Sequence, residues 1–97
     1  MIDHPLHPFE MHPQGGGGFT VFEAGESVAL PLLRLEKATL RGIDGQRMSL
    51  EFSSAMVVVE GEGLTELFGH LLAGRVKTIR RGKHAACVVG AIQIVDL

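Results

Sequence analysis

The sequence predicts an α+β fold that is mostly β: a small bent antiparallel sheet or partly open barrel of six or seven strands, with one helix at about residues 63–73. Two observations carry this prediction. Apolar residues recur at helical spacing in one segment only, and most others alternate with polar residues or form short runs, as in β-strands. A length of 97 residues suits one ordinary domain and leaves no room for a second.

Residues 1–18 are predicted to form a flexible or loosely docked arm that precedes a single globular domain, residues 19–97. The arm holds three of the four prolines and three of the five histidines, and it ends in four consecutive glycines. Prolines favour extended or turn backbone, and glycines lose much conformational freedom when they are ordered. We therefore expect regular structure to begin at Phe19.

Two strands are expected next. Phe19 and Val21 share one face of the first strand, and a turn at 24–27 follows it. The apolar run 28–33 is interrupted by Pro31, which cannot donate a hydrogen bond to a central ladder. This run is therefore predicted to be an edge strand or a bulge.

A hairpin is predicted around Asp44-Gly45, because this pair suits a type I′ turn, in which positive φ is needed. The incoming strand changes phase between Glu36 and Ala38, which indicates a bulge near Lys37. The valine-rich run 55–59 is continuous and apolar, as expected for the buried central strand of a sheet.

The helix is predicted to follow a tight turn, Gly61-Glu62-Gly63, and to end at Gly74. Glycines before a helix can form a phosphate-binding loop, but Glu62 would repel an anion, so this signal is weak. Apolar residues at i, i+3, i+4, i+7 and i+8 form one stripe of the helix. The stripe consists of Leu64, Leu67, Phe68, Leu71 and Leu72.

The last two strands are expected at 76–81 and 86–95, joined by a turn at 81–84. Both faces of the final strand are apolar. We therefore expect this strand to be largely buried.

Charge and cysteine content limit the classes of partner. A formal charge of −2 gives no overall attraction to nucleic acid or to anionic membranes. Cys87 is the only cysteine, which excludes an intrachain disulfide and a multi-thiolate zinc site. No apolar run has membrane-spanning length, and the N-terminus lacks the features of a secretory signal. We expect a cytoplasmic protein without a membrane segment.

A basic cluster at residues 75–84, with five cations and His84, is the densest charge feature. Its positive charges could bind the phosphates of RNA, DNA or a nucleotide. A small-barrel nucleic-acid-binding protein is therefore one alternative. We favour a solubilising strand or a charged sheet edge, because the chain has no Trp or Tyr on which bases could stack. The cations of the cluster are Arg75, Lys77, Arg80, Arg81 and Lys83.

Three histidines of the arm, His4, His7 and His12, could offer imidazole nitrogens to a divalent metal. A metal-binding protein or enzyme is thus the second alternative. Their spacing matches no known zinc motif, and we favour a solvated tail. His70 and His84 are interpreted as separate, solvated side chains.

The favoured prediction is a non-enzymatic module that self-associates, as a dimer, through an apolar strand or helix surface. Hydrophobic residues make up 45% of the sequence, which is difficult for a small monomer to bury, so a second copy is expected to cover an apolar patch. A further protein partner is compatible with this role. No spacing suggests a nucleophile with its base or paired carboxylates, so we predict no catalytic residue and no cofactor.

Overall fold

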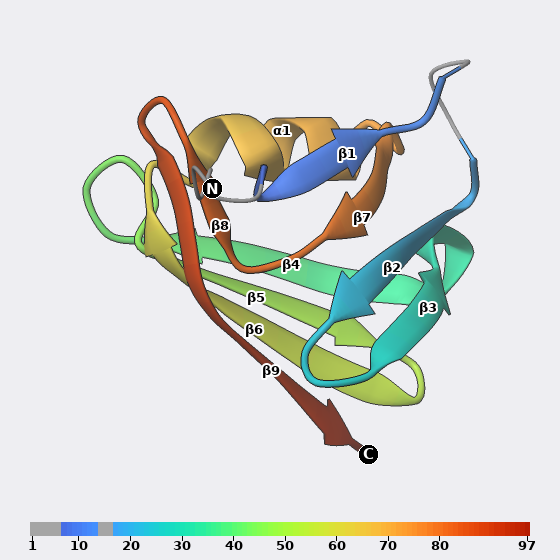
Figure 1. The fold of residues 1–97 in the computed structure, drawn as a ribbon. Helices are drawn as coiled ribbons and strands as arrows, with labels where there is room; N and C mark the ends of the chain where they lie inside the picture. Colours follow the sequence, from blue (N-terminus) through green and yellow to red (C-terminus); the bar gives the residue numbers. More distant parts are fainter. Residues whose placement is uncertain (1–6, 14–16) are drawn as a thin grey trace.

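Two β-sheets enclose one hydrophobic core (Figure 1). The computed structural model describes residues 7–13 and 17–97. One sheet has four strands in the order β1-β7-β2-β3, and the other has five in the order β4-β5-β6-β9-β8. The sheets are not closed into a barrel. The predicted class, α+β and mostly β with one helix, is confirmed.

The described residues form nine strands, more than the six or seven predicted. The first sheet contains β1 (Phe9–Met11), β2 (Phe19–Glu23), β3 (Ser27–Pro31) and β7 (Val76–Ile79). The second contains β4 (Leu35–Arg41), β5 (Arg47–Phe52), β6 (Ala55–Glu62), β8 (Gly82–His84) and β9 (Cys87–Asp96). The helix α1 spans Thr65–Leu72, and a 3-10 turn, Leu32–Arg34, links β3 to β4.

The predicted pair Asp44-Gly45 lies in the loop that joins β4 to β5, but this loop is longer than a two-residue type I′ turn: it spans residues 42–46, and Gln46 N donates a hydrogen bond to the Arg41 carbonyl at 2.8 Å. Asp44 and Gly45 have φ angles of 58° and 77°, in the region that the turn requires. The register shifts between Leu35 and Lys37, which confirms the predicted bulge. Strand β6 lies between β5 and β9 and is the central strand of its sheet, as predicted.

Regular structure begins earlier than expected. Strand β1 precedes Phe19 and pairs antiparallel with β7, with Phe9 opposite Ile79. Two interactions hold it there: the carbonyl of Pro8 accepts a hydrogen bond from Arg80 N at 2.8 Å, and Phe9 packs against the core. The expectation that regular structure starts at Phe19 was therefore wrong, because proline and glycine content does not reveal this docking.

The C-terminal strands are arranged differently from the prediction. Strand β7 belongs to the first sheet, where it pairs parallel with β2 and antiparallel with β1, and it forms no hairpin with β9. The segment 82–84, expected to be a turn, is the strand β8. It pairs with β9 around a turn at Ala85-Ala86, where Ala85 has a φ of 53°. The chain therefore crosses from one sheet to the other at Arg80-Arg81.

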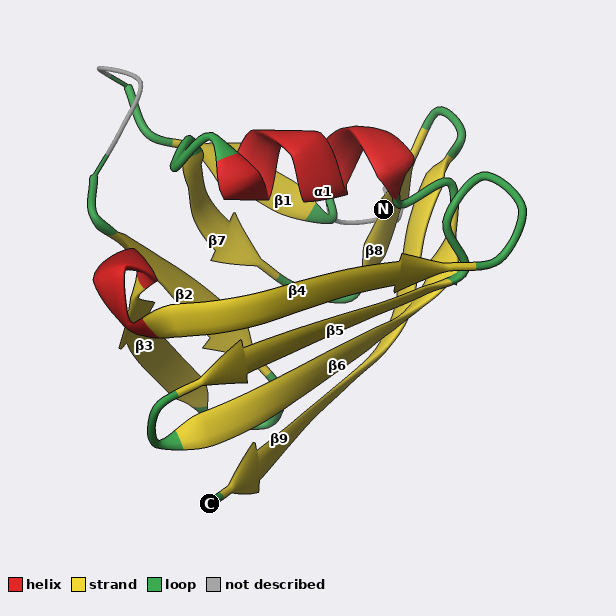
Figure 2. Cartoon of the chain, turned by 180° about the vertical axis from the view of Figure 1, so that it is seen from behind, coloured by secondary structure: helices red, strands yellow, loops and turns green. Residues whose placement is uncertain are grey.

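Helix α1 lies between the edge strands β1 and β4 (Figures 1 and 2). Its Leu67 and Leu71 side chains are buried, as the helical spacing predicts, whereas Leu72 of the predicted stripe is 55% exposed. None of the helices among residues 7–13 and 17–97 is long and apolar enough to cross a membrane. The largest fully buried side chains are Phe22, Phe52, Met48, Leu50, Leu64, Leu67, Leu71, Ile79, Val57, Val59, Val76 and Val89.

The turn before α1 has a structural explanation. A Cβ atom at Gly61 would lie 1.8 Å from the carbonyl oxygen of Val88, and one at Gly63 would lie 2.1 Å from that of Ala86. Both glycines therefore allow close approach of this segment to the β8–β9 hairpin. Close packing against this hairpin therefore explains the two glycines that gave the weak phosphate-loop signal.

Candidate functional site: an open strand edge and a histidine-lined cavity

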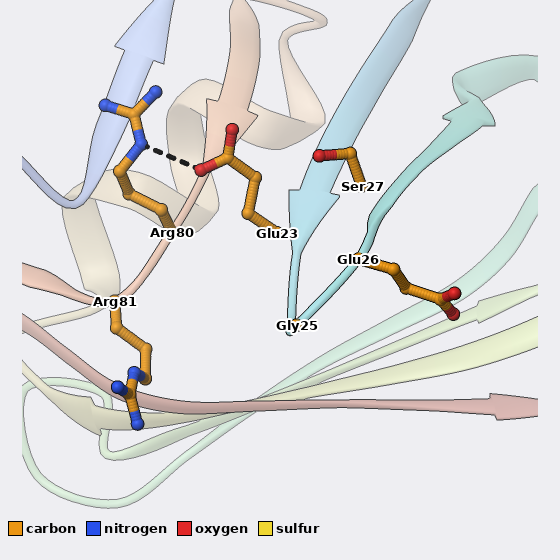
Figure 3. Close-up of a pocket in the computed structure, with 6 residues that line it drawn as sticks. All are labelled: Glu23, Gly25, Glu26, Ser27, Arg80 and Arg81. Carbon is orange, nitrogen blue, oxygen red and sulfur yellow. Dashed lines mark hydrogen bonds and ion pairs between the residues drawn. The ribbon is translucent and has the colours of Figure 1, made fainter.

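The predicted basic cluster is divided between the two sheets. Arg75 follows α1, Lys77 lies on β7, and Lys83 lies on β8. Arg80 and Arg81 occupy the crossing between the sheets (Figure 3). The five cations therefore do not lie on one hairpin, because the expected strands 76–81 and 86–95 belong to different sheets.

Arg80 is held by two carboxylates. Its Nε donates a hydrogen bond to Glu23 at 3.1 Å, and its Nη2 donates one to Glu10. The hydrogen bond that Arg80 donates to Glu10, together with the charge of Arg80, lowers the pKa of the Glu10 carboxyl below its ordinary value. The same hydrogen bond raises the pKa of Arg80. Arg80 thus ties β1 and β2 to the end of β7.

Arg81 points away from Arg80 and Glu23 (Figure 3). It shares a shallow pocket with Glu23 and Glu26, whose negative charges would repel a phosphate group. A nucleic-acid backbone would also have to compete with two carboxylates for Arg80. The nucleic-acid interface stays a prediction, and this arrangement does not favour it.

Of the three histidines predicted to hold a metal, the two that the structure describes, His7 and His12, do not lie together. His4 lies outside the described residues. His7 and His12 are at opposite ends of β1, and His12 Nε2 lies 2.9 Å from the carbonyl oxygen of Phe19, with its ring edge-on to the Phe19 ring. His12 is therefore occupied in joining β1 to β2.

A different group of histidines lines one cavity of about 470 Å³ between β1, α1 and the β8–β9 hairpin. The rings of His7 and His84 lie 4.2 Å apart between centroids. His70 reaches the cavity from α1, where its Nε2 lies 3.4 Å from Glu66 Oε1. The interpretation of His70 and His84 as separate side chains missed this grouping, because these residues are distant from His7 in sequence.

Cys87 also lines this cavity. Burial, and to a lesser degree the charge of Glu66, raise the pKa of its thiol, so Cys87 stays protonated near neutral pH. It therefore lacks the character of an activated nucleophile. Within residues 7–13 and 17–97, no group of three or more His, Cys, Asp or Glu side chains could hold a metal ion.

The second feature is the open edge of β9, defined as residues 90–96. Strand β6 pairs with β9 along its length, but on the other side β8 covers only residues 87–89 (Figures 1 and 2). Residues 90–96 thus have no strand partner on that side within the described part of the chain. Val89 is the only buried residue of β9, so the expectation of a largely buried strand was wrong.

The open edge of β9 has fewer features that would prevent pairing with another strand than the other sheet edges have. Natural edge strands are usually short, bulged, or supplied with charge or proline. Strands β1 and β8 have three residues each, β3 ends in Pro31, and β4 carries a bulge and several charges. The open edge of β9 has the sequence Gly-Ala-Ile-Gln-Ile-Val-Asp, with no charge before Asp96.

Apolar side chains accompany the open edge. Val95 is 38% exposed and Leu97 75% exposed. Other large apolar side chains are exposed as well: Leu33 and Ile43 in connecting segments, Leu72 on α1, Phe19 on β2 and Met11 on the edge strand β1. Compared with the three-residue β1, the open edge of β9 combines exposed apolar residues with a longer free backbone.

Comparison with protein-family models, curated proteins and solved structures found no match.

Proposed function

We propose that this chain is a self-associating module in which two copies pair antiparallel through the open edge of β9. The observation that carries the proposal is the free side of residues 90–96, a strand segment with a backbone ready to pair and little that would prevent pairing. Joining the two copies would extend each five-stranded sheet into a continuous sheet of about twice that width.

A second copy is favoured as the partner because the segment is self-complementary. Two identical strands pair antiparallel around a two-fold axis, which can pass beside Gln93. Ile92 of one copy then lies opposite Ile94 of the other. Both residues face the core side of the sheet, since their neighbours on β6 are the buried Val59 and Val57. The pairing would therefore continue the apolar inner face across the interface.

The residues on the opposite face of β9 and the charge of Asp96 are compatible with the same register. Ala91 of one copy lies opposite Val95 of the other, so two apolar residues meet. Asp96 lies opposite Gly90, and the two Asp96 carboxylates are separated by about six residues, or roughly 20 Å. A parallel arrangement would place these two carboxylates side by side, which is unfavourable. The antiparallel dimer avoids this repulsion.

The test uses the exposed Gln93 at the proposed axis. In Gln93→Lys, two ammonium groups would lie opposite each other, and their repulsion should dissociate the dimer. Gln46→Lys, the same substitution in the exposed loop between β4 and β5, is the control. Size exclusion with light scattering and refractive-index detection suits a chain without Trp or Tyr.

We expect the wild type and Gln46→Lys to have twice the chain mass of 10.4 kDa, and Gln93→Lys to have the mass of one chain. Circular dichroism should show the same β-rich spectrum for all three proteins. A wild type that stays monomeric at every concentration, or a folded Gln93→Lys that stays dimeric, would contradict the proposal.

A further inference from the structure

The open edge of β9 ends beside Arg81. Strand β8 pairs with β9 only as far as Gly82, which lies opposite Val89, and Arg81 is the residue before Gly82. A second strand that pairs with residues 90–96 therefore lies in line with β8 along the same edge. Its last paired residue lies close to Arg81, since neighbouring positions along a strand are only about 3.4 Å apart.

The register of the proposed dimer identifies this last residue as Asp96. In that register Asp96 of the second copy lies opposite Gly90, next to the position that Gly82 occupies. Residue 97 of the second copy has to leave the edge, because Gly82 already pairs with Val89. Gly90 has no side chain that would obstruct Asp96. Strand β8 therefore limits the paired segment to residues 90–96 of both copies.

The side chains of Asp96 and Arg81 lie on the same face of the second sheet. Asp96 pairs with the buried Ala55 of β6, so its side chain points to the same face as that of Ile92. Arg81 lines a pocket of about 340 Å³ together with Ile92, at the point where the chain crosses to the first sheet. The carboxylate of Asp96 from a second copy would therefore approach Arg81 within this pocket.

The charge of Arg81 is available for such a contact. In the described part of the chain, neither Arg81 nor Asp96 takes part in an ion pair. The Arg81 side chain extends away from Arg80 and Glu23 (Figure 3). Among the described residues that line the pocket at Ile92, Glu23 is the one acid, and its carboxylate is bonded to Arg80 at 3.1 Å.

We propose that Arg81 of each copy forms an ion pair with Asp96 of the other copy, so that two identical ion pairs flank the joined β9 strands. This inference rests on the proposed dimer and names the residues that make it selective. The ion pairs favour the antiparallel register centred on Gln93, because a shift of register moves Asp96 away from Arg81. They also disfavour an apolar strand of another protein that has no acid at this position.

The test compares charge-reversal variants by analytical ultracentrifugation with interference optics, which suits a chain without Trp or Tyr. Arg81→Glu and Asp96→Lys should each raise the dimer dissociation constant about tenfold to 100-fold at low salt, because two attractive contacts become repulsive. Arg34→Glu is the matched control with the same change of charge. Arg34 is exposed and precedes β4, at the opposite edge of the second sheet, so this variant should associate as the wild type does.

A mixture of the two reversed variants distinguishes a contact between copies from a defect within one copy. In a mixed dimer of Arg81→Glu with Asp96→Lys, both contacts again join opposite charges, so we expect an affinity near that of the wild type. The double variant Arg81→Glu/Asp96→Lys should recover most of the affinity for the same reason. In a mixture with Arg34→Glu, Asp96→Lys should stay largely monomeric. Salt at about 1 M should reduce all these differences, because it screens exposed charges.

The outcomes separate this inference from the proposed function. A wild type that stays monomeric overturns the dimer and, with it, the ion pair. If the wild type is dimeric but Arg81→Glu associates as Arg34→Glu does, the ion pair is overturned and the dimer stands. The same conclusion follows if the mixture of Arg81→Glu with Asp96→Lys recovers no affinity.

Discussion

Arg80 joins two strands that are distant from it in sequence, β1 and β2, by polar contacts. Its side chain bonds to Glu10 on β1 and Glu23 on β2, and its backbone N donates to the Pro8 carbonyl at 2.8 Å. A solvent-exposed ion pair contributes little to stability, but Arg80 is half-buried and binds two carboxylates at once. Its position in a basic run of sequence suggested a free surface cation, and the run does not reveal the two carboxylates.

The Glu10–Arg80 pair predicts a dependence of stability on pH. The pKa of Glu10 is lowered in the folded state, so its contribution is fully present above the ordinary value of 4.5 and is lost as pH falls through the lowered pKa. Glu10→Gln should reduce the free energy of unfolding at neutral pH and weaken its fall under acid conditions. Urea unfolding at a series of pH values measures both effects.

The control for this experiment is Glu36→Gln. Glu36 is exposed on β4, and no ion pair involves it within the residues that the structure describes. This variant should follow the wild-type pH profile. Equal profiles for the wild type and Glu10→Gln would show that the pair does not stabilise the docked β1.

At the scale of elements, the sequence predicted what local patterns encode. The helix, the Asp44-Gly45 hairpin, the bulge near Lys37 and the central β6 depend on spacing and turn chemistry within short windows, and all are present. Strand β1 and the crossing at Arg80-Arg81 depend on pairing between segments distant in sequence. A repeating pattern of apolar residues within one segment carries no information about such pairing. The sequence therefore did not predict these features or the histidine-lined cavity.

The close approach of β6 to the β8–β9 hairpin predicts contrasting effects for two glycines. A Cβ at Gly61 would meet the backbone oxygen of Val88 at 1.8 Å, whereas a Cβ at Gly90 would lie 3.5 Å from the oxygen of Glu60, an ordinary contact. Gly61→Ala should therefore lower the free energy of unfolding by about 1–3 kcal/mol, the usual cost of overpacking. Because Gly90 lies in the proposed interface, the comparison is made at a concentration at which the chains are monomeric. There, Gly90→Ala should leave the free energy of unfolding within about 0.5 kcal/mol of the wild type.

Urea unfolding of the two variants under identical conditions provides this comparison. Both replace glycine by alanine, so they change the entropy of the unfolded chain similarly, and the difference between them reports the close approach. Similar stabilities would mean that β6 does not approach the hairpin as closely as the structure shows.

At the scale of the whole molecule, the two sides of the paired sheets differ. Helix α1 lies between the edge strands β1 and β4 on one side, whereas on the other side the open edge of β9 extends to the C-terminus (Figures 1 and 2). A domain of this size exposes much of its surface, and the exposed apolar residues are consistent with further burial by association. The proposed second copy would add at this edge, where the β2–β3 turn and Arg81 line a pocket together with Ala91 and Ile92.

The register of the proposed dimer can be tested by crosslinking. In a Cys87→Ser background, Gln93→Cys would place two thiols opposite each other at the axis, with Cβ atoms about 5 Å apart, near the distance at which a disulfide forms. Val95→Cys is the control, because Val95 would oppose Ala91 of the other copy and the two introduced thiols would be separated by about four residues, or roughly 14 Å. Mild oxidation followed by non-reducing electrophoresis should therefore give a covalent dimer for Gln93→Cys and little for Val95→Cys.

A mixture of the Ala91→Cys and Val95→Cys proteins should crosslink more efficiently than Val95→Cys alone, because those two positions face each other. Efficient crosslinking of Val95→Cys alone would instead show that the copies meet in another register or through another surface.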